Sequence, residues 1–408
     1  MSSQELNGKD TTLDNDNDNI ENDNVNTIVT YESFDAIELK EELLRGIYSH
    51  GFNKPSPIQA KAIKPIIMGR DIIAQAQSGT GKTGTFVISI LQLINTDLNE
   101  PQAMIIGPTR ELAEQIKKVC DGIGAYSNVR ICSCIGGIHP SSNIESLSQG
   151  MHIVVGTPGR IYHMIKDRHL KLNQMKLLIL DEADEMLREG FKAQMYEIFN
   201  MGFPQTMQVA LFSATLTDQT NEIAMKFLRN PQKIVLEKKE VNLSGIKQYQ
   251  ILLEKQEYKL DTLIDILKSV SLCQSIIFVN SKQTLISLAK DLQDLKISIT
   301  CIYGDMEQVD RNRTMDEFRN GKFRHMLSTD VTARGIDIQQ VQLVINYDIP
   351  LDRQNYMHRI GRTGRYGRRG VAINFVTKRD EPLVDDIKTF YHLSIDDLPG
   401  DLTGIFDK

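Results

Sequence analysis

Several features are scarce in this chain of 408 residues, and each scarcity argues against a class of protein. The five cysteines form neither a C-x-x-C pair nor a disulfide-dense framework, which is typical of a reducing compartment. No apolar run reaches the ~18 residues of a membrane span. The first residues are polar and acidic, unlike a secretory signal. Basic residues are not in excess either. The net charge of −6 means that any contact with nucleic acid must come from local patches or backbone N–H groups.

The pattern of apolar residues predicts an α/β protein with two domains. Strands alternate with amphipathic helices from about residue 31, an order that predicts a parallel sheet covered on both sides. Strands are expected at 103–107, 129–135, 152–156, 176–181 and 208–213. The order breaks at Asn230-Pro231 and restarts, with strands expected at 248–253, 275–280, 298–303, 325–329, 341–347 and 371–376.

The domain boundaries follow from these breaks. Residues 1–30 contain an Asn/Asp tract that has too few apolar side chains to offset the entropy of ordering, so we predict a disordered tail. The first domain is expected at 31–236 and the second at 247–408. Between them, the charged stretch at 237–246 is predicted to be a linker.

A phosphate-binding motif lies near the start of the first domain. The sequence AQSGTGKT at 76–83 follows an apolar run and precedes apolar residues at helical spacing. A strand, a small-residue turn and a helix N-terminus place backbone N–H groups and the helix dipole around a phosphate. The pattern is that of a P-loop with alanine at the first glycine position, and a glycine-rich turn without a ligand is the alternative. Lys82 would reach the terminal phosphates and Thr83 would ligate Mg²⁺. The predicted nucleotide contacts here are Gln77, Ser78, Gly79, Thr80, Gly81, Lys82 and Thr83.

The stretch KLLILDE at 176–182 matches the second half of a P-loop ATPase site. Asp181, at the end of an apolar strand, would hold Mg²⁺, and Glu182 would orient or deprotonate the attacking water. The acidic pair could instead begin the next helix, where the helix dipole favours negative charge. The P-loop upstream favours the ATPase interpretation.

At this point the chain shows a family resemblance. Residues 181–184 spell D-E-A-D, and from about residue 31 to 408 the sequence resembles the DEAD-box RNA helicases. The resemblance implies two tandem RecA-like domains, ATP with Mg²⁺, an RNA substrate and a monomer. Ser213 and Thr215 resemble the motif that couples the ATP state to strand separation, and Asp184 and His358 are expected to share that role. The adenine-reading Q motif is resembled by a set of residues, namely Phe34, Phe52, Lys54, Pro55 and Gln59.

The second domain resembles the family as well. The stretch HRIGRTGR at 358–365 resembles the arginine-finger motif, and Arg362 and Arg365 would share a face if the stretch is helical. Guanidinium groups suit the charge that develops on a transferring phosphoryl group, and such fingers are worth roughly 10³–10⁵ in rate. A basic surface that binds phosphate backbone non-specifically is the alternative. Gly335 and Asp337 resemble the segment that holds the ribose of ATP.

RNA contacts are implied by the same resemblance. They fall on hydroxyls, small-residue turns and single arginines, a set that reads the phosphate-sugar backbone and predicts no sequence specificity. Thr109 could equally cap the following helix. The implied residues are Pro108, Thr109, Arg110, Gly136, Gly137, Thr157 and Arg160 in the first domain and Asn280, Arg311 and Thr329 in the second.

Within the family, the chain resembles the subgroup of translation initiation factor 4A and its exon-junction and nucleolar relatives. The segments at 41–48, 181–187, 245–249 and 344–348 carry this likeness. It implies an ATP-dependent RNA helicase that works in translation initiation with a scaffold protein. An ATP-locked RNA clamp in an exon-junction or rRNA-processing complex is the alternative, and a DNA-directed motor is a third. The sequence shows no basic nuclear-import cluster, which favours the cytoplasm over the nucleus.

Overall fold

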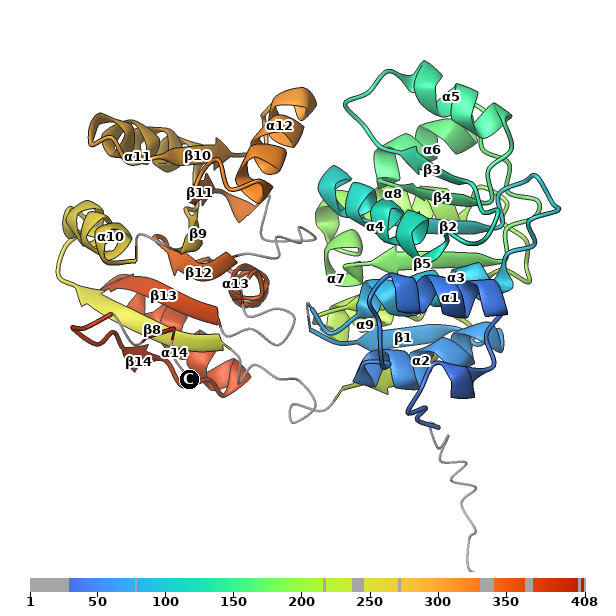
Figure 1. The fold of residues 1–408 in the computed structure, drawn as a ribbon, viewed down its shortest axis with the longest axis horizontal. Helices are drawn as coiled ribbons and strands as arrows, with labels where there is room; N and C mark the ends of the chain where they lie inside the picture. The colour runs from blue at the N-terminus through green and yellow to red at the C-terminus, as the bar shows by residue number, and fades with distance from the viewer. Residues whose placement is uncertain are drawn as a thin grey trace, which may run out of the picture.

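The computed structural model describes residues 29–77, 79–215, 218–236, 246–270, 273–330, 341–363, 370–402 and 405–406. The described part contains two parallel sheets of seven strands, each packed against helices, which confirms the predicted α/β class (Figure 1). The predicted tail and linker fall almost wholly outside the described residues, so both stay predictions.

The first sheet has the spatial order β3-β4-β2-β5-β6-β1-β7. Its strands are β1 (Ile72–Gln75), β2 (Ala103–Ile106), β3 (Ile131–Cys134), β4 (Ile153–Gly156), β5 (Leu177–Asp181), β6 (Gln208–Ser213) and β7 (Gln232–Val235). The helical elements around it are η1 (Asp35–Ile37), α1 (Glu41–Ser49), α2 (Pro57–Ile67), α3 (Lys82–Leu93), α4 (Arg110–Ile123), α5 (Pro140–Ser148), α6 (Pro158–Lys166), α7 (Ala183–Met186), α8 (Glu189–Phe199) and α9 (Asp218–Ala224).

The second sheet repeats this arrangement in the order β10-β11-β9-β12-β13-β8-β14. Its strands are β8 (Ile246–Leu253), β9 (Gln274–Phe278), β10 (Ile299–Ile302), β11 (His325–Ser328), β12 (Val341–Asn346), β13 (Gly370–Thr377) and β14 (Asp396–Asp397). The helices are α10 (Tyr258–Ser269), α11 (Lys282–Asp294), α12 (Gln308–Arg319), α13 (Arg353–Ile360) and α14 (Glu381–Tyr391).

Burial of both sheet faces explains why the central strands were predictable. Within β1, Ile72 and Ala74 pack into the core on one face of the sheet, and Ile73 packs into the core on the other. Strands buried on both faces must be apolar throughout, which is the pattern that the sequence shows. The edge strand β7 was not predicted, because Ile234 is its only fully buried residue and it follows directly on the break at Asn230-Pro231.

Strand order brings three of the predicted motifs together. β5, β6 and β1 are neighbours in the first sheet, and all run in the same direction. The register pairs Gln75, just before the P-loop, with Ser213, and pairs Asp181 with Phe212. The P-loop, the acidic pair and the Ser213 motif therefore meet at the carboxyl ends of adjacent strands, where α/β sheets bind ligands.

The second domain lies beside this edge. In Figure 1, α13 is on the side of the second domain that faces α7 of the first.

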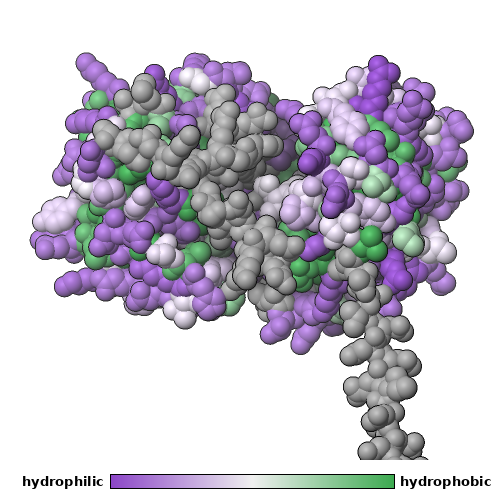
Figure 2. Space-filling view, turned by 60° about the horizontal axis from the view of Figure 1, so that its bottom comes forward, coloured by the Kyte–Doolittle hydropathy of each residue, from purple (hydrophilic) through white to green (hydrophobic). Residues whose placement is uncertain are grey.

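On the face drawn in Figure 2 the described residues are mostly hydrophilic, and apolar side chains occur in small groups. Among the described residues, no helix is long and apolar enough to cross a membrane.

Candidate active site

The P-loop connects β1 to α3. Gly79 and Gly81 have φ angles of +82° and +98°, in the left-handed region that glycine adopts readily. A Cβ at Gly81 would also lie 2.7 Å from Ser56 Oγ and 2.9 Å from Gln59 Nε2, so these side chains would have to shift. Lys82 is buried, and its Nζ donates a hydrogen bond to the Ala76 carbonyl oxygen at 2.9 Å. The ammonium group is thereby held inside the loop. Of the other predicted phosphate contacts, Ser78 lies outside the described residues, and the half-buried ones are Gln77, Thr80 and Thr83.

Gln59 connects the predicted Q motif to the P-loop. Its Oε1 accepts from the Ser56 backbone N–H at 2.8 Å, and its Nε2 donates to the Gly81 carbonyl oxygen at 3.3 Å. Phe52 lies at the same place, because a Cβ at Gly84 would come within 2.8 Å of its ring. An amide and an aromatic ring therefore lie together at the start of α3. The other two predicted contacts on this segment are the exposed Lys54 and the half-buried Pro55.

Phe34 is not part of this site. Its side chain has no exposed surface and packs in the core, with its ring edge-on to Tyr48 at 6.3 Å between centroids. A ring without an exposed face cannot stack on an adenine in this arrangement. The structure therefore assigns Phe34 to the packing of η1 and α1, and Phe52 is the partly exposed ring of the motif.

Asp181 and Glu182 are buried at the end of β5. Burial and then the charge of Glu182 raise the pKa of Asp181 to about 7, against an opposing effect of Lys82. Glu182 has φ +51° and ψ +51°, an uncommon backbone conformation for a residue with a side chain. Glu182 is also the N-cap residue of α7. The alternative prediction, that the acidic pair begins the next helix, therefore describes the same residues. A divalent cation beside the pair would remove the unfavourable like-charge interaction, so these carboxylates fit Mg²⁺.

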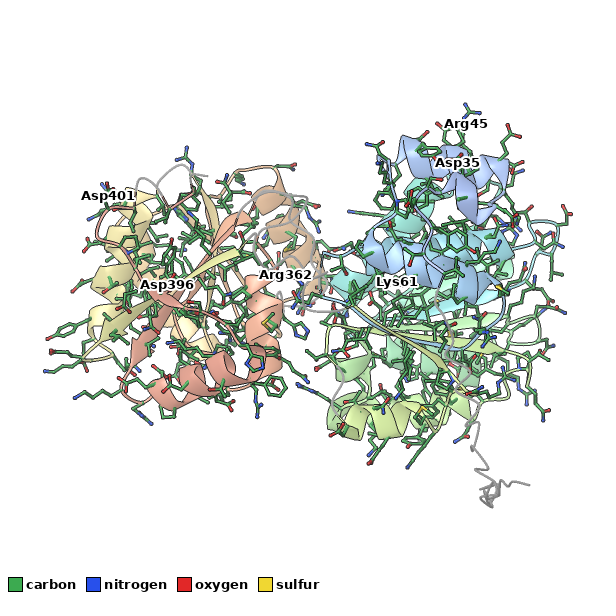
Figure 3. The ribbon with its side chains drawn as sticks, turned by 90° about the horizontal axis from the view of Figure 1, so that it is seen from below. Asp35, Arg45, Lys61, Arg362, Asp396 and Asp401 are labelled. Carbon is green, nitrogen blue, oxygen red and sulfur yellow. The ribbon has the colours of Figure 1, made fainter. Side chains whose placement is uncertain are left out.

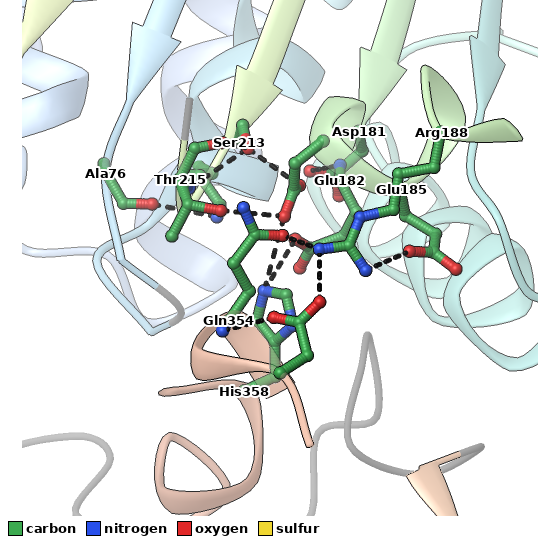
Figure 4. Close-up of polar contacts among 12 residues, drawn as sticks. Ala76, Asp181, Glu182, Glu185, Arg188, Ser213, Thr215, Gln354 and His358 are labelled. Atoms are coloured by element: carbon green, nitrogen blue, oxygen red, sulfur yellow. Dashed lines mark hydrogen bonds and ion pairs between the residues drawn. The ribbon is translucent and has the colours of Figure 1, made fainter. Parts of the chain in front are cut away.

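Asp184 connects segments that are far apart in the sequence, and Figure 4 labels its neighbours Ser213, Thr215 and His358. Its Oδ1 accepts from the Ser213 hydroxyl at 2.7 Å, and its Oδ2 accepts from Thr215 Oγ1 at 3.0 Å. Nε2 of His358, on α13, lies 3.8 Å from both Asp184 Oδ2 and Glu182 Oε2. Three potential metal-ligand atoms, from Glu182, Asp184 and His358, thus lie within 4.8 Å of one another. The acidic motif of the first domain is in direct contact with the second domain.

Arg362 is buried close to this network. Its Nε donates to the His358 carbonyl oxygen at 3.1 Å, and Figure 3 shows Arg362 on the side of the second domain that faces the first. α13 ends at Ile360, so Arg362 lies beyond the helix and the predicted helical face does not include it. Arg365, Gly335 and Asp337 lie outside the described residues.

Most of the predicted RNA contacts of the first domain surround Arg110. A Cβ at Gly136 would lie 3.0 Å from Arg110 Nη2, and one at Gly137, which has φ +82°, would lie closer still to the guanidinium group. Thr109 caps α4, since its Oγ1 accepts from the Leu112 N–H at 3.2 Å, as the alternative for this residue predicted. Of the remaining residues, Pro108 is buried, and the half-buried Arg160 donates to Asn143 and, at 2.8 Å, to the Ile138 carbonyl oxygen. Thr157 is half-buried as the N-cap residue of α6.

The predicted RNA contacts of the second domain are more enclosed. Arg311 is buried, and its Nη1 lies 2.7 Å from Glu111 Oε1 of the first domain. Its Nη2 donates to the carbonyl oxygens of Tyr303 and Gly304. Arg311 therefore lies between the domains and not on an open surface. The Glu111 carboxylate compensates for the burial of its guanidinium group, which would be costly without a charged partner. Asn280 is exposed with its amide bonded to Ile349 and Arg359, and Thr329 is half-buried.

Sequence reasoning did not predict several contacts that join the domains. Gln308 Oε1 accepts from Arg110 Nη1 at 3.0 Å, and Arg188 Nη2 lies 2.8 Å from Asp352 Oδ2. Arg188 also donates to Gln354. Their polar or charged character was visible, but no local pattern shows which side chains from two domains will face each other.

Comparison with known proteins places this geometry in a family. Residues 56–223 match the DEAD/DEAH box helicase family, and residues 258–367 match the helicase conserved C-terminal domain. The chain is 52% identical over 368 residues to the ATP-dependent RNA helicase eIF4A of Aspergillus niger, covering 90% of this chain and 92% of that protein. It is 50% identical to the protein of the same name from Mycosarcoma maydis, with 90% and 89% covered.

The fold is also similar to that of a solved structure. Dbp5 of S. cerevisiae bound to RNA and ADP BeF3 superimposes with a TM-score of 0.85 at 34% identity, covering 91% of this chain and 96% of that one. A Dbp5 variant bound to Nup159, Gle1, IP6 and ADP gives only 0.64 at 33% identity, with 89% and 96% covered. The chain thus superimposes more closely on the first of these structures than on the second.

Proposed function

Since the chain belongs to the eIF4A family of ATP-dependent RNA helicases, we propose that its ATPase site is shared by the two domains and that RNA controls its completion. The chain is an ATP-hydrolysing enzyme that acts on RNA. The observation that supports the shared site most directly is the approach of His358 in the second domain to Glu182 and Asp184 in the first, at 3.8 Å.

In the proposed site the first domain binds most of the nucleotide. Gln59 and Phe52 would recognise the adenine, since an amide can donate and accept at one base edge and a partly exposed ring can stack on its face. Backbone N–H groups of the P-loop would hold the phosphates, and Lys82 would exchange the Ala76 carbonyl oxygen for a phosphate oxygen. Thr83 and Asp181 would hold Mg²⁺, which would neutralise charge on the phosphates.

Hydrolysis would require both domains. Glu182 would orient and deprotonate the attacking water, while Arg362 and Arg365 would stabilise charge on the transferring phosphoryl group. Asp337 would bind the ribose, beside Gly335. Because Ser213 and Thr215 hold Asp184 and His358 lies beside it, a shift of either domain would alter the position of the catalytic carboxylate. ATP and RNA, by favouring the same closed arrangement, would each tighten the binding of the other.

RNA would be held by its backbone. Hydroxyl groups, small-residue turns and arginines carry no pattern of donors and acceptors matched to one base, so binding should not depend on sequence. Arg110, Gly136 and Gly137 lie at the seam between the domains, beside Gln308, and a strand bound there would favour closure. Within the cell we propose a cytoplasmic monomer that works in translation initiation with a scaffold protein. Co-purification of cap-binding scaffolds supports this role, whereas recovery of splicing or nucleolar factors alone contradicts it.

The Glu182→Gln variant tests the shared ATPase site. We expect RNA-stimulated hydrolysis to fall at least about 10²-fold, because the amide cannot accept a proton, while ATP still binds. Glu197→Gln is the matched control, since Glu197 is an exposed glutamate on α8. Steady-state ATPase rates with and without single-stranded RNA, and binding of a fluorescent ATP analogue, provide the measurements. A Glu182→Gln enzyme as fast as the parent, or a parent rate that RNA does not change, refutes the proposal.

A further inference from the structure

Arg188 makes a contact between the domains that the proposed chemistry does not use (Figure 4). Its Nη2 lies 2.8 Å from Asp352 Oδ2 and also donates to Gln354 Oε1, both in the second domain. Its Nη1 lies 3.6 Å from Glu185 Oε2 of the first domain. We infer that Arg188 is a positioning residue that holds α13 against α7 when the domains close, and so sets how strongly nucleotide and RNA binding are coupled. The inference rests on the proposed shared ATPase site.

The location of the contact carries the argument. Arg188 follows α7 by two residues, and the same short helix starts with Glu182 as its N-cap and holds Asp184 in its first turn. Asp352 is the N-cap of α13, the helix that carries His358. The ion pair therefore joins the end of one catalytic element to the start of the other, and it limits the relative motion of His358 and the acidic motif.

The side-chain chemistry suits a contact that forms on closure. Glu185, within the same domain, holds the guanidinium group before the second domain arrives. The planar guanidinium group can then bind Asp352 and Gln354 through Nη2 while Nη1 stays beside Glu185, a division between two nitrogen atoms that an ammonium group does not offer. Asp352 is already fixed, since its Oδ1 accepts from the Gln354 N–H at 2.7 Å. Because both side chains are already held within their own domains, forming the contact costs them less conformational entropy.

Exposure limits the strength of the contact. The side chains of Arg188 and Asp352 are 36% and 37% exposed, so water and salt weaken their attraction. We expect Arg188→Gln to lower the affinity for RNA in the presence of AMP-PNP by about threefold. Arg188→Glu, which places a second negative charge beside Asp352, should lower it by about tenfold, and the deficit should shrink as salt is raised. The affinity of each variant for nucleotide without RNA should match that of the parent.

The chain offers a closely matched control. Arg353, next to Asp352, forms an ion pair with Asp386 at 2.9 Å, with side chains 43% and 49% exposed, but both residues belong to the second domain. Arg353→Gln should therefore leave the coupling unchanged. Asp352→Asn removes the charge and keeps the helix cap, because asparagine caps as well as aspartate. If the two residues act as a pair, the double variant Arg188→Gln/Asp352→Asn should be no weaker than either single variant.

The measurements are fluorescence anisotropy of a labelled single-stranded RNA with and without AMP-PNP, and steady-state ATPase assays. We expect Arg188→Gln to raise the KM for RNA with little change in kcat, because saturating RNA still closes the domains. A parent-like RNA affinity for Arg188→Glu, an equal loss in Arg353→Gln, or additive losses in the double variant overturns the inference. If the parent enzyme itself binds RNA equally with and without AMP-PNP, the proposed function fails, whatever the Arg188 variants do.

Discussion

The buried ion pair between Arg311 and Glu111 leads to a quantitative prediction about domain closure. The two side chains are 8% and 5% exposed, and their charged atoms lie 2.7 Å apart. Arg311 belongs to α12 of the second domain and Glu111 to α4 of the first. Replacing either residue with glutamine leaves the other charge buried whenever the domains close.

The magnitude follows from what each remaining charge can still bond. In Glu111→Gln, Arg311 keeps its bonds to the carbonyl oxygens of Tyr303 and Gly304. In Arg311→Gln, Glu111 loses the charged partner of Oε1, and its Oε2 has no hydrogen bond within the described part of the chain. Breaking a fully buried pair costs about 3–5 kcal/mol. Because separation of the domains can rehydrate the charge, we expect a loss of about 2–3 kcal/mol in closure for Arg311→Gln, or about 30- to 150-fold. Glu111→Gln should lose less.

The assay compares RNA affinity in the presence and absence of AMP-PNP for the two single variants and the double variant. The double variant buries no unpaired charge, so it should bind RNA at least as well as Arg311→Gln. Lys117→Gln is the control, because Lys117 pairs with Asp121 within α4 at 2.7 Å. The reasoning is refuted if Arg311→Gln loses less than about threefold, or if its RNA affinity falls equally without nucleotide, since neither result fits a contact made on closure.

Two further predictions concern stability. His325 is buried beside Ser275, and burial lowers its pKa to about 4 from 6.5, so between those values an unfolded chain binds a proton that the native protein does not. The contribution of His325 to the free energy of unfolding is therefore complete above pH 6.5 and falls by about 1.4 kcal/mol per pH unit down to about pH 4. Urea titrations at several pH values should show this slope, and the His325→Val variant should lack it. Gly46 lies on α1, and an added Cβ would overlap the Ile123 carbonyl oxygen of α4. Gly46→Ala should therefore destabilise the first domain by about 1–3 kcal/mol in thermal unfolding. An unchanged Tm would contradict this packing.

The sheets and the P-loop could be predicted because their signals are local. The central strands are buried on both faces, so each appears in the sequence as a continuous apolar run. Gly79 and Gly81 mark a turn whose φ angles only glycine adopts readily. Where a strand is only partly buried, the apolar pattern did not predict it. The example is β7, in which exposed and more buried residues alternate over four positions.

The details of the site were less predictable, because they depend on which side chains face each other. Phe34 belongs to the Q-motif pattern, yet the packing of η1 against α1 buries it completely. Arg311 is predicted to contact RNA, and its pairing with a carboxylate on α4 was not predicted. Nothing in the local sequence of either residue records these neighbours, which lie in other elements or in the other domain.

The character of the contacts between the domains explains why ligands can control closure. The hydrophobic clusters of the described residues each belong to one domain, and none combines side chains from both. What joins the domains is polar: Arg110 with Gln308, Glu111 with Arg311, and His358 beside the acidic motif. The desolvation of such groups offsets most of their attraction, so closure without ligands has a small net free energy. An equilibrium near balance is shifted by modest differences in ligand affinity, whereas an apolar interface of the same size would hold the domains closed. Under the proposed function, RNA and nucleotide binding would therefore decide whether the domains close, and the ATPase site would be complete only while both are bound.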